Sequence, residues 1–169
     1  MRHIRRTLAL LGLALAAAPL GAQEAPAPLT VVAANRTAQA EAARGTPRAD
    51  AAARPGDVVR YTLTLRNPGG ERIRGVTLAN PVAAGMRFVG GSARSSRDDV
   101  RTEYSADGGR SWSAQPTEEV VVEGRRVRRP VPAERYTHVR WTIDGWVAPG
   151  ATVTAEFDAR LGAAPAPGR

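Results

Sequence analysis

The stretch PGDVVRYTLTLRNPGG at residues 55–70 decides the fold. After the turn Pro55-Gly-Asp57, apolar and polar side chains alternate strictly, and Asn67-Pro-Gly-Gly70 closes the segment with residues typical of turns. The apolar set is Val59, Tyr61, Leu63 and Leu65, and the polar set is Arg60, Thr62, Thr64 and Arg66. A period of two places the two sets on opposite faces of a β-strand, with one face in the core.

The same reasoning extends outward in both directions along the chain. Short apolar or alternating runs bounded by turn residues predict further strands at 29–34, 76–78, 86–88, 101–106, 120–122, 126–128, 139–143 and 153–161. Glu123-Gly124 predicts a hairpin turn. Seven to eight short strands, each with one polar face, predict an all-β antiparallel β-sandwich over 54–161.

The N-terminal third differs in composition. Residues 1–6 are basic, residues 8–18 are continuously apolar, and Pro19, Gly21 and Ala22 follow. This layout predicts a signal peptide over 1–22, because the apolar run is shorter than the roughly 20 residues that span a bilayer. The protein is therefore expected to be exported, to the periplasm or to the cell surface and exterior. No later segment is long and apolar enough to predict a transmembrane segment.

Two other segments lie outside the predicted sandwich. Residues 23–53 are expected to hold one strand at 29–34 and an Ala/Arg-rich loop, although a short helix over 37–43 is the alternative. The Gly/Ala/Pro-rich residues 162–169 predict a disordered tail.

The composition excludes several kinds of chemistry. The chain has 169 residues and no cysteine, so it contains no disulfide, thiolate metal site or cysteine nucleophile. All 24 basic side chains are arginine and the net charge is +8. Two interpretations of the arginine bias remain open. One is the codon usage of a GC-rich genome, and the other is selection for bidentate contacts to phosphate or carboxylate groups.

Several motifs together carry a family resemblance. They are Pro55-Gly-Asp57, residues 61–65, Asn67-Pro-Gly-Gly70, Gly75-Val-Thr-Leu78, Asn80-Pro81 and Met86-Arg-Phe-Val89, followed by residues 104–109, 136–141 and 148–150. The chain resembles the bacterial conserved-repeat domain of unknown function eleven, in a single-domain exported branch. The resemblance implies an immunoglobulin-like antiparallel β-sandwich in an exported or surface protein. The family has no assigned catalytic residues, so none is carried over.

A turn motif follows the strand at 101–106. Ser105, Asp107, Gly109 and Trp112 have the spacing of an Asp-box, a folding element of β-propellers. The aspartate can accept backbone hydrogen bonds and the glycine can adopt positive φ. We therefore predict a structural turn that Trp112 anchors in the core. A carbohydrate-active accessory function ranks last, because one copy cannot build a propeller.

The densest charge lies in the predicted hairpin, at Arg125, Arg126, Arg128 and Arg129. This cluster could bind a polyanion such as an acidic polysaccharide or lipopolysaccharide phosphate. The alternative is a solvated hairpin whose charge is balanced by nearby glutamates. No aromatic residues interleave the arginines, so nucleic acid is not indicated as a partner.

The remaining chemistry-bearing residues predict no catalytic, cofactor or metal site. His138 lies on the polar face of its strand beside Arg140, and Asp98-Asp99, Glu103 and Asp107 do not follow a known calcium-ligand spacing. Trp141 is expected in the core, whereas Trp146 is ambiguous. The sequence therefore predicts a non-enzymatic envelope protein with a structural or protein-binding role. Its partner would be another envelope or surface protein.

Overall fold

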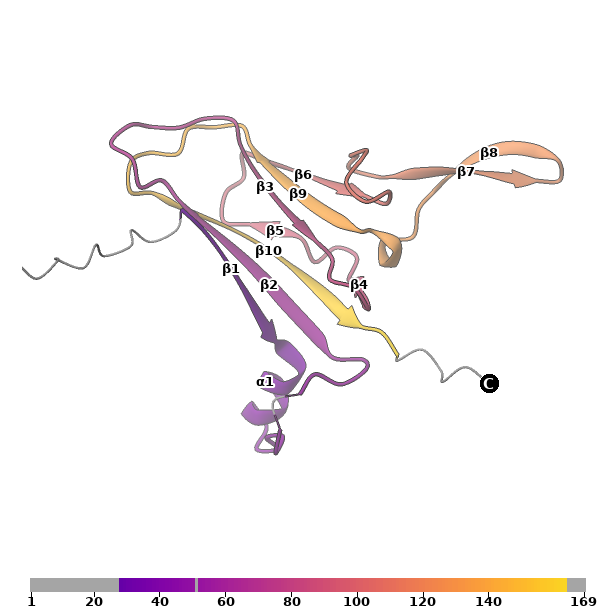
Figure 1. The fold of residues 1–169 in the computed structure, drawn as a ribbon, viewed down its shortest axis with the longest axis horizontal. Helices are drawn as coiled ribbons and strands as arrows, with labels where there is room; N and C mark the ends of the chain where they lie inside the picture. The colour runs from indigo at the N-terminus through magenta and orange to yellow at the C-terminus, as the bar shows by residue number, and fades with distance from the viewer. Residues whose placement is uncertain (1–27, 51, 164–169) are drawn as a thin grey trace, which may run out of the picture.

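The computed structural model describes residues 28–50 and 52–163 (Figure 1). Eight strands form two sheets that stack on one another. The five-stranded sheet contains β1 (Leu29–Asn35), β2 (Val58–Arg66), β10 (Thr152–Leu161) and β4 (Met86–Phe88) in that order, with β5 (Arg94–Ser95) also pairing with β10. The three-stranded sheet has the order β3 (Val76–Pro81), β9 (His138–Ile143), β6 (Val100–Ser105). Every pairing between these strands is antiparallel.

The core lies between the two sheets and confirms the two-residue alternation. Leu63 from β2, Phe157 from β10 and Trp141 from β9 are fully buried, and the Tyr61 ring stacks on Phe157 with centroids 5.0 Å apart. Full burial of such side chains stabilises the fold by about 1.5–3 kcal/mol each. The fold is thus the predicted immunoglobulin-like antiparallel β-sandwich.

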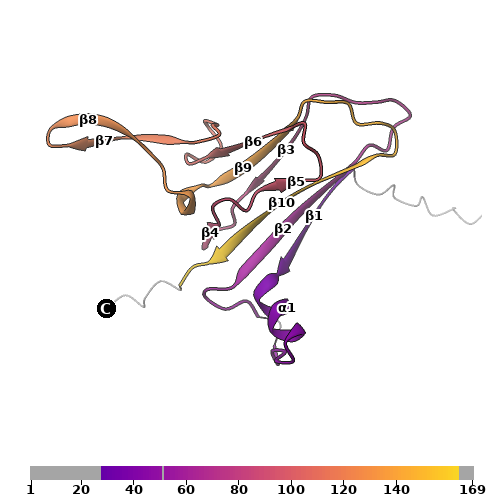
Figure 2. The same cartoon turned by 180° about the vertical axis from the view of Figure 1, so that it is seen from behind.

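The predicted hairpin at 120–128 forms but does not belong to the sandwich. Its strands are β7 (Thr117–Val122) and β8 (Arg125–Pro130). Within the described part of the chain they pair only with each other and form a separate two-stranded sheet. This hairpin, residues 117–130, projects from one side of the sandwich and is called the arm below (Figures 1 and 2). A 3-10 turn, η1 (Ala133–Arg135), follows where the chain returns to the body.

The prediction of a loop after the first strand was wrong for residues 36–43. They form the helix α1 (Arg36–Ala43), which begins where the Asn35 side chain accepts a hydrogen bond from the Ala38 N–H at 3.0 Å. The helix buries no residue, which explains why the sequence shows no apolar stripe there. Its stability therefore depends on the cap and on ion pairs.

A nearly buried ionic network closes the segment between α1 and β2. The Arg48 guanidinium donates to both Asp57 oxygens, with Nη2 to Oδ1 at 2.7 Å, and its Nε donates to Glu41 at 2.5 Å. Asp57 also accepts from the Asn35 amide at 2.7 Å and from the Arg54 N–H at 2.9 Å. These donors, Arg48 first, hold the pKa of the Asp57 carboxyl well below its ordinary value, against the opposing effect of burial.

Two predictions concern segments outside the residues that the structure describes. The signal peptide at 1–22 lies outside the described residues, as do residues 164–169 of the predicted tail. Among the described residues, no helix has the length and apolar character needed to span a membrane.

The Asp57 network makes the free energy of unfolding depend on pH, and its contribution decreases at low pH. Because the folded pKa is lower than the unfolded one, the contribution of Asp57 is complete above the unfolded pKa near 3.8 and declines as the pH falls below it. Asp57→Asn should lower the Tm by several degrees at neutral pH, since it leaves the nearly buried Arg48 without its main counter-charge. The difference from wild type should shrink as the pH falls towards 2.

Thermal unfolding followed by circular dichroism over this pH range measures the effect. Asp50→Asn is the matched control, because its carboxylate pairs with Arg54 on the exposed surface. Equal Tm shifts for the two variants at neutral pH would contradict the assigned role.

Candidate functional site

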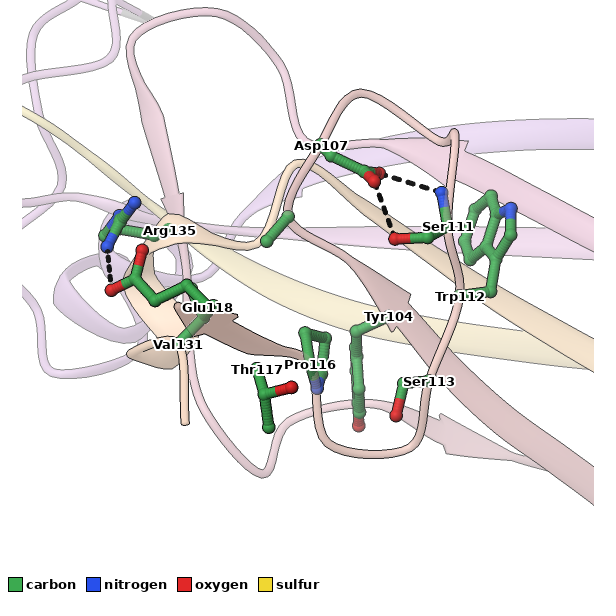
Figure 3. A pocket seen from close by; sticks show the side chains of 11 residues that line it. Tyr104, Asp107, Ser111, Trp112, Ser113, Pro116, Thr117, Glu118, Val131 and Arg135 are labelled. Atoms are coloured by element: carbon green, nitrogen blue, oxygen red, sulfur yellow. Dashed lines mark hydrogen bonds and ion pairs between the residues drawn. The ribbon is translucent and has the colours of Figure 1, made fainter. Parts of the chain in front are cut away.

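The turn after β6 is built around two side chains. The Ser105 hydroxyl donates to Asp107 Oδ1 at 2.7 Å and accepts from the Gly109 N–H at 2.8 Å. Asp107 accepts two hydrogen bonds from Ser111, one from its hydroxyl at 2.6 Å and one from its N–H at 2.9 Å (Figure 3). It accepts a further one from the Arg110 N–H at 3.1 Å. Gly108 and Gly109 have φ of 77° and 86°. This is the geometry expected of a structural turn.

These hydrogen bonds also define what Asp107 can do chemically. Several hydrogen-bond donors hold the pKa of the Asp107 carboxyl well below its ordinary value, and the Ser111 hydroxyl has the largest effect. A carboxylate that stays ionised and whose two oxygens already accept these bonds is a poor general acid or base. The Asp107 carboxylate is therefore committed to holding the turn.

The prediction that Trp112 enters the core was wrong. It is half-buried on the outer face of β9, with its ring edge-on to His138 at 6.1 Å and the Arg140 guanidinium 4.4 Å from its centroid. The strand alternation explains the difference, because Val139 and Trp141 occupy the inner face and His138 and Arg140 the outer one. Arg140 is in turn held by Glu103 at 2.8 Å.

A groove of about 320 Å³ lies between this turn and the base of the arm (Figure 3). Its polar wall includes an ion pair between Arg135 and Glu118, with Nη1 and Oε1 2.7 Å apart. Apolar contacts come from Tyr104, Pro116 and Val131. The charged side chains of the groove, Asp107, Glu118 and Arg135, are thus already paired with one another or with the turn.

The arm places the four predicted arginines on two faces. In its register Val120 lies opposite Val127, Glu119 opposite Arg128, and Val121 opposite Arg126. Residues two apart share a face, so Arg126 and Arg128 lie on one side of the arm, and Arg125 and Arg129 lie on the other. The cluster is therefore contiguous in sequence but divided in space.

Arg126 and Arg128 are strongly exposed. Their side chains are 83% and 76% accessible, and they share one acidic neighbour, Glu119, at 3.9 and 3.8 Å. Exposed pairs at such distances contribute little energy and leave the guanidinium groups open to other anions. The turn between the strands contains Glu123 and Gly124 with φ of 50° and 77°, which is typical of a tight hairpin.

Sequence reasoning missed the apolar side chains that the arm exposes. Val121 is 69% accessible, Val122 43% and Val127 40%. The sequence predicts strands and a hairpin here, from the apolar run at 120–122 and the alternation at 126–128. The alternation predicts which residues share a face, but not whether another element covers that face.

The other candidate residues are dispersed. Asp99 pairs with Arg97, Glu103 with Arg140, and Asp107 with its own turn, so the carboxylates considered for calcium do not converge. Trp141 is fully buried, as predicted. Trp146 is 47% exposed and lies under the Arg72 guanidinium at 4.4 Å. Among the described residues, no group of three or more His, Asp or Glu side chains has an arrangement that could hold a metal ion.

The fold and the site together define an immunoglobulin-like sandwich with a projecting β-hairpin. No protein-family model matches the chain, and no curated protein matches it. Among solved structures, it is similar to the pilus backbone RrgB from Streptococcus pneumoniae, with 15% sequence identity and a TM-score of 0.36. That match covers 80% of this chain and 46% of the pilus chain, so this chain spans less than half of its length.

The positive φ of Gly109 gives a test of the turn. Gly109→Ala should reduce the free energy of unfolding by about 1–2 kcal/mol, because a Cβ disfavours this left-handed conformation. Gly70→Ala is the matched control, since Gly70 lies in a turn without positive φ and has open space around it. Urea denaturation of both variants measures the difference, and an unchanged midpoint for Gly109→Ala would contradict the turn geometry.

Proposed function

We propose that this protein is a non-enzymatic module of the bacterial cell envelope that acts by binding another envelope or surface protein. The observation that carries the proposal is the arm, an exposed two-stranded sheet with accessible valines on both of its faces. The sequence supports the location, because its first 22 residues have the layout of a signal peptide. The resemblance to the conserved-repeat family supports the same setting.

The energetics of the arm favour a binding role. A two-stranded hairpin is marginally stable in water, because it buries little apolar surface. Neither strand pairs with a third strand among the described residues, so both outer edges leave backbone N–H and C=O groups unpaired. The exposed valines lie beside charged residues. A partner strand added to either edge would satisfy the backbone groups and cover the valines, which is the usual mode of strand addition.

The polar groups of the adjoining groove do not favour catalysis. Asp107 is engaged by the turn, Glu118 by Arg135, and His138 contacts the Thr137 hydroxyl at 3.1 Å. A carbohydrate-active role therefore remains the least supported of the three functions considered.

Partner binding is tested by changing the arm alone. Val121→Lys should weaken partner capture at least about tenfold, the loss expected when a contact worth about 1.4 kcal/mol is removed. Ala40→Lys is the matched control, because it adds the same charge at an exposed position on α1, away from both the arm and β1. Photo-crosslinking from residue 122 in envelope extracts, followed by quantification of the captured protein, measures the change. Equal capture by wild type and Val121→Lys would overturn the proposal.

The second candidate function is polyanion binding through the arm. It is favoured by the exposure of Arg126 and Arg128, whose shared ion-pair partner, Glu119, lies 3.9 and 3.8 Å from their guanidinium nitrogens. Because these two arginines share a face, they could contact two anionic groups of one polysaccharide chain together. Arg125 and Arg129 would serve a second chain on the opposite face.

The two functions differ in their salt dependence. Retention of the protein on immobilised heparin should weaken steeply with salt if the arm binds polyanions. Arg126→Glu combined with Arg128→Glu should then elute at clearly lower salt than Arg36→Glu combined with Arg44→Glu, which makes the same charge change on α1 and just after it. Equal shifts for the two double variants would show that only net charge matters and would eliminate this candidate.

A further inference from the structure

Among the described residues, 28–50 and 52–163, strand β1 pairs only with β2 and is a free sheet edge that lacks the usual protection against pairing. Other free edges carry charges, including Arg87 in β4, Arg94 in β5, the Arg101 and Glu103 pair in β6, two glutamates in β7 and four arginines in β8. The edge strand β3 ends at Pro81. By contrast, β1 has seven residues, LTVVAAN, without a charge or a proline. Charged residues and prolines are the common devices that keep an edge from pairing with another copy of itself, whereas a partner strand of complementary charge can still pair with the arm.

The inner face of β1 is apolar and uncovered. Its register places Leu29 beside Leu65 and Val31 beside Leu63, so these side chains point to the same face as the core. They are nevertheless 40% and 49% exposed. The Phe88–Tyr104 contact, with centroids 5.3 Å apart, places β6 over β4, on the side of the larger sheet away from β1. Strand β3, at the other edge of the three-stranded sheet, therefore lies on the β1 side. The three-stranded sheet thus ends before it reaches β1.

The backbone of β1 is prepared for a further strand. The Arg66 N–H donates to the Pro28 carbonyl at 2.8 Å, which makes this a hydrogen-bonded pair of the β1–β2 ladder. Antiparallel ladders alternate, so Thr30, Val32 and Ala34 direct their backbone groups towards β2. The N–H and C=O groups of Leu29, Val31 and Ala33 are directed towards the free side.

We propose that a second copy of this chain occupies this edge, through antiparallel pairing of β1 with β1 about a two-fold axis at Val32. In this register Val31 of one copy faces Ala33 of the other. The N–H and C=O groups that these residues direct away from β2 can then form hydrogen bonds between the two copies. Val32 faces its own counterpart as a non-hydrogen-bonded pair, in which side chains approach most closely. Leu29, Val31 and Ala33 of the two copies then form one continuous apolar strip.

Charge explains why β1 is the edge that pairs with itself. The same operation applied to β8 would bring arginines of both copies together, and like charges on opposing strands are destabilising. On β1 no charge meets another, so nothing opposes the pairing. The resulting interface is isologous and closed, which gives a dimer and not a fibre. A single strand pair is a small interface, so the dimer is expected to depend on protein concentration.

The proposal is independent of partner binding by the arm, and one set of variants separates them. Sedimentation velocity of the purified protein over a wide concentration range should show a monomer–dimer equilibrium. Val32→Lys should shift it to monomer, because two ammonium groups would oppose each other across the axis. Val121→Lys, with a similarly exposed valine on the arm, should dimerise like the wild type. A monomer at every concentration, or equal dimerisation by Val32→Lys, would overturn the proposal.

Cysteine substitution tests the register directly, because the chain contains no cysteine. Val32→Cys should form a covalent dimer on mild oxidation, since opposed residues of a non-hydrogen-bonded pair have Cα atoms about 4.5 Å apart, within disulfide range. Val121→Cys is the control for random collision. Equal crosslinking of the two variants would refute β1 pairing. It would not affect the proposal that the arm binds a partner, which the capture experiment tests separately.

Discussion

The pairing of β2 with β10 is the interaction on which the rest of the structure depends. Nine residue pairs, from Thr152 with Arg66 to Arg160 with Val58, join the segment after α1 to the last strand. On the inner side this ladder places Leu63 beside Ala155 and Tyr61 beside Phe157. On the outer side Arg60 bridges Glu156 at 3.1 Å and Asp158 at 2.7 Å. The central ladder is thus stabilised by apolar burial on one face and by charge pairing on the other.

Every other strand of the larger sheet is added to this ladder. β1 extends it through β2, whereas β4 and β5 extend it through β10. The end of the ladder is closed by mutual backbone bonds between Leu161 and residues 56–57, at 2.8 Å each. Arg48 reaches the same end by binding Asp57, so the ionic network holds α1 and its loop against the strand that carries the core.

The alternation of residue types predicts the sandwich because burial in a sheet is itself periodic. The alternation at 139–143 predicts that Val139 and Ile143 share a face with Trp141, and all three are fully buried. Whether a face is covered depends on distant segments. The valines of the arm and of β1 lie in apolar runs that predict strands, but they remain exposed because no element among the described residues packs over them. The sequence favours a loop over the alternative helix at 37–43, because the stability of α1 comes from Asn35 and Arg48, outside the helix itself.

The two open surfaces lie on opposite sides of the sandwich, as both views show (Figures 1 and 2). The arm extends beyond β6 and β9, whereas β1 borders the flank next to α1. Occupation of one surface therefore leaves the other accessible. A two-fold dimer through β1 would present two arms, related by symmetry and held by a rigid core. Two linked sites raise the effective concentration of the second binding event, so weak contacts at each arm would combine into a much stronger attachment to a repeated partner.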